Sequence, residues 1–278
     1  WTKSAPYRPP AAVATRMYLP TRSSLSRSKS SKARTERGGP LPRSLFISDL
    51  HLYSSRPATI RALDTFLQDS IDAEALYILG DLFEAWLGDD DDAPLARDVT
   101  ALLRRFSDAG PPLYLMQGNR DFLLGERLCE AVGATFLADP TVIDLYGTST
   151  LLMHGDSLCT ADADYQSFRK MARDPAWQAD LLSRSLEERR AIAEHLRSVS
   201  KDASSNKAED IMDVSPQAVQ LELQAHGVQR LIHGHTHRPA THSEAAGERW
   251  VLGDWDASGW YIEATPSQLK LIEFDIIQ

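Results

Sequence analysis

The stretch SLFISDLH, residues 44–51, joins a short apolar run to an aspartate and a histidine that stand two residues apart. A short apolar run bounded by polar residues is typical of a buried strand. The same pattern recurs in LYILGD (76–81), LYLMQGNRD (113–121), TLLMHGD (150–156) and LIHGHTH (231–237). Because open α/β sheets place ligand crevices at the carboxyl ends of their strands, the five clusters predict one site at that edge.

The segments between these clusters first alternate helix and strand patterns and then become rich in strands. Apolar residues at helical spacing predict helices at 57–70, 93–107 and 122–132. A hairpin is expected at 142–153, and further strands at 250–252, 260–264 and 269–274. This order predicts an α/β protein with two mixed β-sheets sandwiched by helices.

Residues 160–216 have a different sequence pattern, because they contain no strand-like run, show helical spacing and are rich in charged residues. They fall between two of the polar clusters, so we expect a helical cap above the site. Phe168, Met171, Trp177 and Leu181 are among more apolar residues than a pair of helices needs for its own contacts. Two interpretations stay open: the helices pack on the main domain, or they form an apolar groove that faces the site.

The first 43 residues form a basic leader with ten Lys or Arg and one acid. Its net charge is +9, which leaves −18 on the rest of the chain. A Ser-, Pro- and Arg-rich segment without apolar periodicity is expected to be disordered. A transit-like address, a nucleic-acid arm, a patch for anionic lipid and an over-extended reading frame are the alternatives, and we assign the leader no function. The folded part is expected to span 44–278, with the cap at about 160–216.

Composition sets the broad class of the protein. The chain has 42% hydrophobic and 25% charged residues, which is ordinary for a soluble globular protein. No run reaches the roughly 18 apolar residues of a membrane-spanning helix, so we expect none. Cys129 and Cys159 are too few for a disulfide framework, suit a reducing cytoplasm, and are expected to be buried, inert thiols.

The polar residues at the strand ends have the chemistry of a two-metal site. Two divalent cations about 3.5–4 Å apart polarise a phosphoryl oxygen and supply hydroxide near neutral pH. The expected ligands are Asp49, His51, Asp81 and His237 for one ion, and Asp81, Asn119, His154 and His235 for the other. Asp81 is the expected bridge. Mixed Asp, Asn and His ligation without thiolate favours Mn²⁺, with Fe²⁺ or Zn²⁺ as alternatives. The histidines expected to be structural are His195, His226, His233 and His242.

The five clusters together resemble the pattern of the calcineurin-like metallophosphoesterase superfamily. One departure concerns Arg120, which follows Asn119 where members that cleave protein phosphoesters typically carry a histidine that protonates the departing alkoxide. Arginine does not give up a proton at working pH, but it binds phosphate oxygens bidentately. The leaving group should then already be a stable anion, such as a phosphate monoester. We infer pyrophosphate cleavage, provided that no other group, such as His235, acts as the acid.

Longer blocks narrow this resemblance. They are LYILGDLFEAWLGDDD (76–91), GNRDFLLG (118–125), LLMHGDSLCT (151–160), SK…K…IMDV (200–214) and LIHGHTHRPA (231–240). These blocks are similar to the UDP-2,3-diacylglucosamine pyrophosphatase family of lipid A biosynthesis. The resemblance implies water attack on the α-phosphorus of UDP-2,3-diacylglucosamine, giving UMP and 2,3-diacylglucosamine 1-phosphate (lipid X). It also implies two Mn²⁺ per chain, a cap that receives the acyl chains, and a peripheral position on the cytoplasmic face of the inner membrane. We expect a monomer without a nucleic-acid partner.

The same resemblance assigns roles to individual residues. Catalytic roles fall on Asn119, Arg120 and His235, and substrate contacts on Asn119, Arg120, Asp162, Ser200, Ser204, Lys207 and His235. Ser204 stands where the family often has Asn, with Asn206 nearby. Asp162 as a helix cap and Lys207 as a solvated charge are the structural alternatives. The alternative functions are a phosphodiesterase or nucleotide pyrophosphatase for soluble substrates such as UDP-sugars, and a binding module that has lost catalysis.

Overall fold

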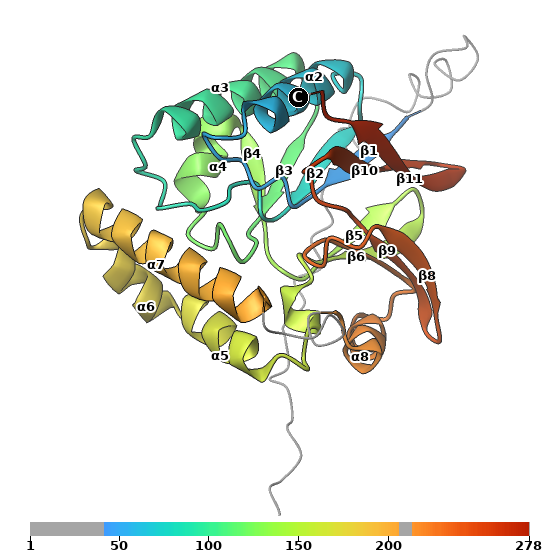
Figure 1. The fold of residues 1–278 in the computed structure, drawn as a ribbon. Helices are drawn as coiled ribbons and strands as arrows, with labels where there is room; N and C mark the ends of the chain where they lie inside the picture. Colours follow the sequence, from blue (N-terminus) through green and yellow to red (C-terminus); the bar gives the residue numbers. More distant parts are fainter. Residues whose placement is uncertain (1–41, 206–212, 278) are drawn as a thin grey trace, which may run out of the picture.

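The computed structural model describes residues 42–205 and 213–277, and for 200–205 it describes the backbone alone. These residues form two β-sheets that pack face to face, with helices on both outer faces (Figure 1). The predicted architecture of two sheets between helices is therefore confirmed.

The first sheet has six strands in the order β11-β10-β1-β2-β3-β4. Its parallel strands are β1 (Ser44–Ile47), β2 (Ala75–Leu79), β3 (Leu113–Met116) and β4 (Ala134–Leu137). The C-terminal hairpin of β10 (Ser258–Thr265) and β11 (Gln268–Asp275) extends this sheet, because β10 pairs antiparallel with β1. Both faces of β1 are covered, which explains its uninterrupted apolar sequence.

The second sheet has five strands in the order β5-β6-β7-β9-β8. They are β5 (Thr141–Leu145), β6 (Thr148–Leu152), β7 (Arg230–His233), β8 (Ala240–Glu244) and β9 (Gly247–Val251). Strands β6, β7 and β9 are parallel, whereas β5 and β8 pair antiparallel at the two edges. The expected hairpin is β5–β6, and its turn consists of Tyr146 and Gly147, which both have positive φ, at 53° and 85°, as a two-residue hairpin turn requires.

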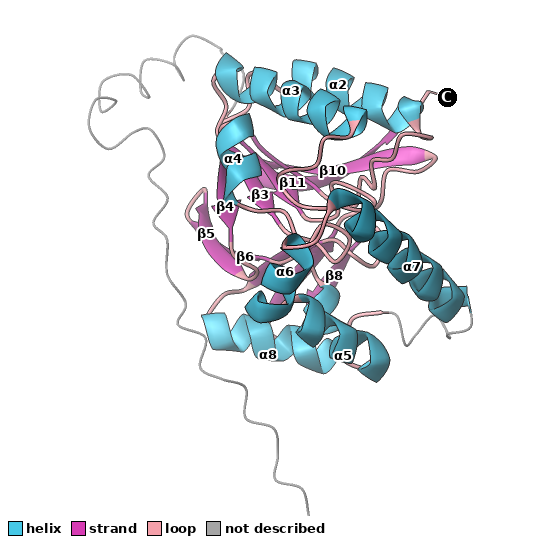
Figure 2. Ribbon diagram, turned by 90° about the vertical axis from the view of Figure 1, so that its left-hand side faces the viewer, coloured by secondary structure: helices cyan, strands magenta, loops and turns pink. Residues whose placement is uncertain are grey.

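Three apolar clusters hold the layers together. The first joins the first sheet to α2 (Pro57–Asp69), α3 (Pro94–Ala109) and α4 (Glu126–Val132). The second lies between the two sheets and the third between the second sheet and α8 (Pro216–His226). Successive side chains of strand β1 point to opposite faces of the sheet. Leu45 and Ile47 belong to the cluster on the helix side, and Phe46 belongs to the cluster between the sheets. Figure 2 shows α2 and α3 on one side of the strands and α8 on the other.

Some elements differ from the sequence expectation for identifiable reasons. Helix α4 begins at Glu126 rather than near 122, because the Asp89 carboxylate accepts hydrogen bonds from the amides of Gly125 (3.0 Å) and Leu128 (3.0 Å) and so fixes its first turn. The edge strands β4 and β8 were not predicted. Strand β8 has the polar sequence ATHSE and little buried surface, so it lacks the apolar signal of a strand.

The region expected to form the cap contains α5 (Ala163–Ala172), α6 (Pro175–Leu182) and α7 (Leu186–Ser205), which lie together at one end of the layered structure (Figure 1). Leu181 is buried in the first core cluster, and Phe168 and Trp177 pack against it. These side chains therefore pack on the main domain. Met171 and Leu182 are instead 42% and 43% exposed. Among the helices of the described ranges, none combines the length and apolar character needed to cross a bilayer.

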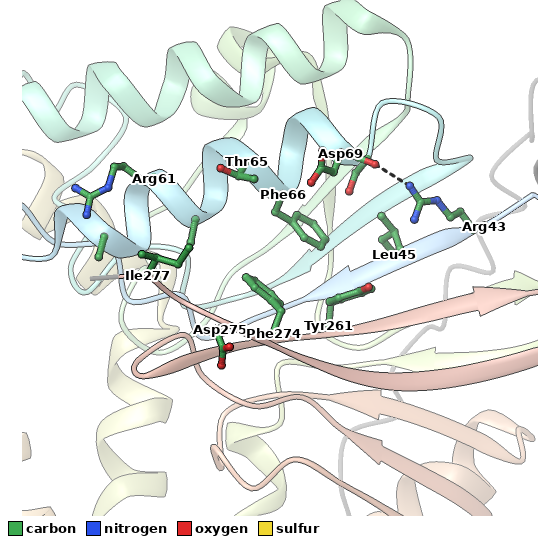
Figure 3. A pocket seen from close by; sticks show the side chains of 13 residues that line it. Arg43, Leu45, Arg61, Thr65, Phe66, Asp69, Tyr261, Phe274, Asp275 and Ile277 are labelled. Atoms are coloured by element: carbon green, nitrogen blue, oxygen red, sulfur yellow. Dashed lines mark hydrogen bonds between the residues drawn. The ribbon is translucent and has the colours of Figure 1, made fainter.

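A cavity of about 500 Å³ lies between α2 and the strands β1, β10 and β11 (Figure 3). Phe66 of α2 faces Tyr261 and Phe274 of the strands across it. Its described lining residues include none from the five polar clusters. The chemistry predicted from the sequence therefore lies elsewhere, at the carboxyl edge of the two sheets.

Candidate metal centre

The five polar clusters meet because each follows the carboxyl end of a strand, namely β1, β2, β3, β6 or β7. Backbone hydrogen bonds continue from the strands into the loops, from Asp49 N to Gly80 O (3.1 Å) and from Gly234 N to His154 O (2.9 Å). The Asp49 carbonyl also accepts a hydrogen bond from Trp255 N (3.1 Å), just before β10. Ladder geometry therefore sets the relative positions of the loops.

Five of the expected ligands have a left-handed backbone. They are Asp49 (φ 55°), His51 (47°), Asp81 (51°), His235 (67°) and His237 (54°). Residues other than glycine seldom adopt this conformation, which persists where surrounding contacts impose it and which clusters at functional sites. The strained positions coincide with the residues selected from the sequence for their ligand chemistry.

The first group of ligand atoms belongs to Asp49, His51 and His237, and all lie within 4.8 Å of one another. The Nε2 atoms of the two histidines are 3.1 Å apart, and Asp49 Oδ1 is 3.5 Å from His237 Nε2. Asp49 Oδ2 accepts hydrogen bonds from Ser48 Oγ and His235 N, but the buried Oδ1 has no hydrogen-bond partner. An unpartnered buried carboxylate oxygen facing two imidazole nitrogens fits a bound cation.

The second group joins Asp49, Asp81 and His154, and Asn119 adjoins it. His154 Nδ1 lies 2.9 Å from the carbonyl of Leu79, which can only accept, so Nδ1 carries the hydrogen. In the neutral ring, Nε2 then presents a lone pair to Asn119 Oδ1, 2.9 Å away. Two lone pairs that face each other, on His154 Nε2 and Asn119 Oδ1, can both bind one cation.

The side chain of Asn119 also brings His235 to this second group, because its Oδ1 atom lies 2.7 Å from His235 Nδ1. The structure thus gathers all seven residues that the sequence suggests as ligands. Asp81 lies between the groups, with Oδ2 3.8 Å from His51 Nε2 and Oδ1 3.7 Å from His154 Nε2. This is the position expected of a bridge. Asp49 belongs to both groups as well, although the sequence-based assignment placed it on one ion.

The charges of the site are strongly coupled. Burial alone would raise the pKa of Asp49, but His237 and the other imidazoles hold that pKa well below its usual range. Burial opposes protonation of His154 and His237, yet the surrounding carboxylates raise the pKa of each to about 9. Burial, reinforced by the positive charge of His154, lowers the pKa of His235 to about 4. The carboxylates therefore attract positive charge to the centre, as a cation site requires.

Two carboxylates that sequence reasoning missed orient this centre. Glu84 Oε2 lies 3.0 Å from His51 Nδ1 and can accept its hydrogen, which turns the lone pair of Nε2 toward the first group. Asp121 is fully buried and accepts hydrogen bonds from Gly118 N (2.7 Å) and Leu82 N (2.8 Å), so it ties two ligand loops together. Asp121 belongs to a quoted cluster, but nothing in its spacing indicated this role. Glu84 had no distinguishing spacing.

Two glycines of the clusters are explained by close approach. A Cβ atom at Gly118 would lie 2.0 Å from Asp81 Oδ1, and one at Gly234 would lie 2.2 Å from Asp49 Oδ2. Real side-chain atoms do not come this close. The loops can therefore bring two carboxylates into the centre only where the neighbouring chain lacks a side chain.

The expected substrate contacts outside the metal groups are described unevenly. Arg120 lies close enough to Glu84 that its charge, with the hydrogen bond from His51, lowers the pKa of Glu84 against the opposing effect of burial. Asp162 caps α5 by accepting a hydrogen bond from Tyr165 N (3.0 Å), as the structural alternative proposed. Lys207 lies outside the described residues, as do the side chains of Ser200 and Ser204.

Comparison with known proteins identifies the class of this protein. Residues 42–239 match the family model described as calcineurin-like phosphoesterase. The chain therefore belongs to the calcineurin-like phosphoesterase family, and the fold expected from the resemblance is confirmed. It contains the candidate ligands for the dinuclear metal site of such hydrolases.

Curated relatives narrow the family further. The chain is 56% identical over 229 residues to a UDP-2,3-diacylglucosamine hydrolase of Marinobacter nauticus, covering 81% of this chain and 94% of the relative. A protein of the same name from Cellvibrio japonicus is 52% identical, covering 84% and 99%. A third, from Salmonella paratyphi B, is 47% identical with the same coverage. Within its family, the chain groups with the UDP-2,3-diacylglucosamine hydrolases.

Proposed function

We propose that this protein hydrolyses the pyrophosphate bond of UDP-2,3-diacylglucosamine, giving UMP and 2,3-diacylglucosamine 1-phosphate. The names of its relatives support the substrate. The observation that carries the chemistry is the convergence of two overlapping groups of ligand atoms, which share Asp49, at the ends of the strands. Arg120 follows Asn119 at the edge of this centre, where it can bind the phosphates of a substrate.

The residues present fit a pair of divalent ions, which Asp49, His51, Asp81, Asn119, His154, His235 and His237 would hold. Such ions, when bound, stabilise negative charge on phosphoryl oxygens and lower the pKa of water. We propose Mn²⁺, because the donors are carboxylate, amide and imidazole groups without thiolate. Asn119 and His235 would bind the reacting phosphate group as well as the ions.

Arg120 would hold the phosphate oxygens with its guanidinium group and keep the α-phosphorus in line for attack. The oxygen of water bonds to the α-phosphorus, the bond from that phosphorus to the bridging oxygen breaks, and the proton of water passes to solvent. The departing sugar 1-phosphate has a second pKa of about 6, so it leaves as an anion and needs no acid from the protein.

We further propose that the protein acts as a monomer at the cytoplasmic face of the inner membrane, where its lipid substrate resides. Withdrawing acyl chains from a bilayer forgoes about 0.8 kcal/mol per CH₂ group. Apolar side chains of the cap, such as the exposed Met171 and Leu182, would offset part of this loss. Asp162 and the polar residues at the end of α7 (Ser200 and Ser204) and beyond it (Lys207) would contact the sugar and the nucleotide.

A phosphorus NMR time course with UDP-2,3-diacylglucosamine in ¹⁸O-labelled water tests this proposal. We expect the label in UMP, and no turnover by the Asp81→Ala or His154→Ala variants. The His195→Ala variant should retain wild-type turnover, because His195 is neither in the two groups of candidate ligands nor among the proposed substrate contacts. Label in the sugar phosphate would contradict attack on the α-phosphorus. Equal rates with a deacylated substrate at the same concentration would favour a phosphodiesterase for soluble nucleotide sugars.

A further inference from the structure

Helix α5 of the cap ends at Ala172, and the guanidinium group of its C-cap residue, Arg173, contacts the loop that precedes Asn119. Its Nη1 donates to Gln117 Oε1 (2.7 Å), and its Nη2 donates to the carbonyls of Gly118 (3.0 Å) and Gln117 (3.4 Å). A single cap side chain therefore makes three hydrogen bonds to the turn that carries Asn119 and Arg120. Hydrogen bonds from a charged donor are stronger than neutral ones.

The opposite side of the same loop is held by buried carboxylates. Asp121 accepts a hydrogen bond from Gly118 N (2.7 Å), and Asp81 Oδ1 accepts one from Arg120 N (2.7 Å). Gly118 also packs so closely against Asp81 that there is no room for a side chain. The loop can therefore shift only away from Asp81, and Arg173 holds its carbonyls on the side toward the cap.

Helix α5 contacts the His154 loop too, through the buried carboxylate of Asp156. Asp156 Oδ2 accepts hydrogen bonds from Tyr165 OH (2.8 Å) and Arg169 Nε (2.9 Å), and Arg173 Nη2 lies 4.0 Å from it. Side chains of one helix thus contact the two loops that supply Asn119 and His154. The position of α5 on the main domain therefore affects the positions of Asn119 and His154 in the second metal group.

We propose that Arg173 is a positioning residue, which holds the Gln117 and Gly118 carbonyls and thereby sets the places of Asn119 and Arg120 relative to Asp81. It acts through these residues and not by touching the reacting atoms. The activity readout of this inference rests on the proposed function. The metal-binding readout does not, because it needs no substrate.

The full chain, freed of metal, can be titrated calorimetrically with Mn²⁺ as wild type and as the Arg173→Gln and Arg173→Lys variants. For Arg173→Gln we expect one of two Mn²⁺ equivalents to bind about tenfold or more weakly, the range seen when residues supporting metal ligands are removed. The other should bind as in wild type. With the lipid nucleotide, kcat should fall by a similar factor and KM should rise, because Asn119 and Arg120 also contact the substrate. Arg173→Lys should recover part of the loss, because an ammonium group still donates to one carbonyl.

Arg184→Gln is the matched control, since Arg184 is an exposed cap arginine that follows α6 and pairs with Asp180 of that helix. It should bind both equivalents and turn over as wild type. If Arg173→Gln does not fold, Gln117→Leu removes the side-chain acceptor while Arg173 stays, and the same direction of change is expected.

Wild-type affinity for both ions in Arg173→Gln, or an equal loss at both together with a lowered unfolding temperature, overturns the proposal. Failure of the wild-type protein to hydrolyse the lipid nucleotide would reject the proposed function instead, and the metal titration would still decide the role of Arg173.

Discussion

Replacing Gly118 with alanine should disable the centre without unfolding the protein. The added methyl group would lie 2.0 Å from Asp81 Oδ1 and 2.3 Å from Asp81 N, whereas atoms in ordinary contact are about 3.5–4.0 Å apart. The loop or the carboxylate must therefore move by more than about 1 Å, well beyond the ~0.2 Å tolerance of metal–ligand distances. A displacement of about 1 Å costs about 100-fold in rate, or about 2.7 kcal/mol in the activation barrier.

The assay measures kcat with the lipid nucleotide and the metal content per chain in the same preparation. Gly110→Ala is the control, because this residue has a φ of 123° and nothing lies within 4 Å of an added Cβ. Backbone strain should lower its stability by about 1–3 kcal/mol and leave turnover unchanged. Wild-type turnover by a Gly118→Ala protein that binds two ions would refute the reasoning. It would mean that the centre does not require the position of the Asp81 carboxylate described above.

Three further predictions concern protons and metal. Glu84→Ala should weaken Mn²⁺ binding by about 10–100-fold. Glu84→Gln keeps an oxygen that accepts the hydrogen of His51 Nδ1, so its loss of Mn²⁺ affinity should be much smaller. Calorimetric titration with Mn²⁺ compares the two variants. Since His154 and His237 have a pKa of about 9 without metal, Mn²⁺ binding near pH 7.5 should release about two protons per chain, and fewer as the pH rises past 9. Titrations in buffers of different ionisation enthalpy count them, and no release would contradict these pKa values. Burial lowers the pKa of His233 to about 3, whereas the pKa of a histidine in the unfolded chain is about 6.5. Between these two pH values the unfolded chain binds a proton at His233 and the folded chain does not. This contribution to stability is complete above pH 6.5 and is lost as the pH falls toward 3, by about 2–3 kcal/mol between pH 7 and 4.5. Urea denaturation should show a flatter pH profile for His233→Gln.

The central strands and the ligand residues are predictable from the sequence, because burial on both faces demands apolar runs and the polar clusters directly follow them. Asp49 and Asp81 illustrate this, since each stands within two residues of a buried strand. The pairing order is not predictable in this way. Nothing in the sequence of β1 indicates that it lies between β2 and β10, the first strand of the C-terminal hairpin.

The residues that orient the ligands also escape prediction, because their roles depend on contacts between distant segments. Arg173 and Gln117 are 56 positions apart, and Glu84 and His51 are 33 apart. Aspartate and histidine adopt the left-handed conformation more often than most residues do, but they occur throughout the chain, so residue type does not mark these positions. Tertiary contacts impose that conformation, so only the folded structure reveals it.

The position of β10 has a consequence for how the protein matures. Strand β10 lies beside β1, and the amide of Trp255 is bonded to the Asp49 carbonyl. These groups are synthesised long after the loop that they support. While β10 is still in the exit tunnel, the edge of β1 is unpaired and the Asp49 loop lacks its contact with Trp255. Metal loading is therefore expected to follow the pairing of β10 with β1.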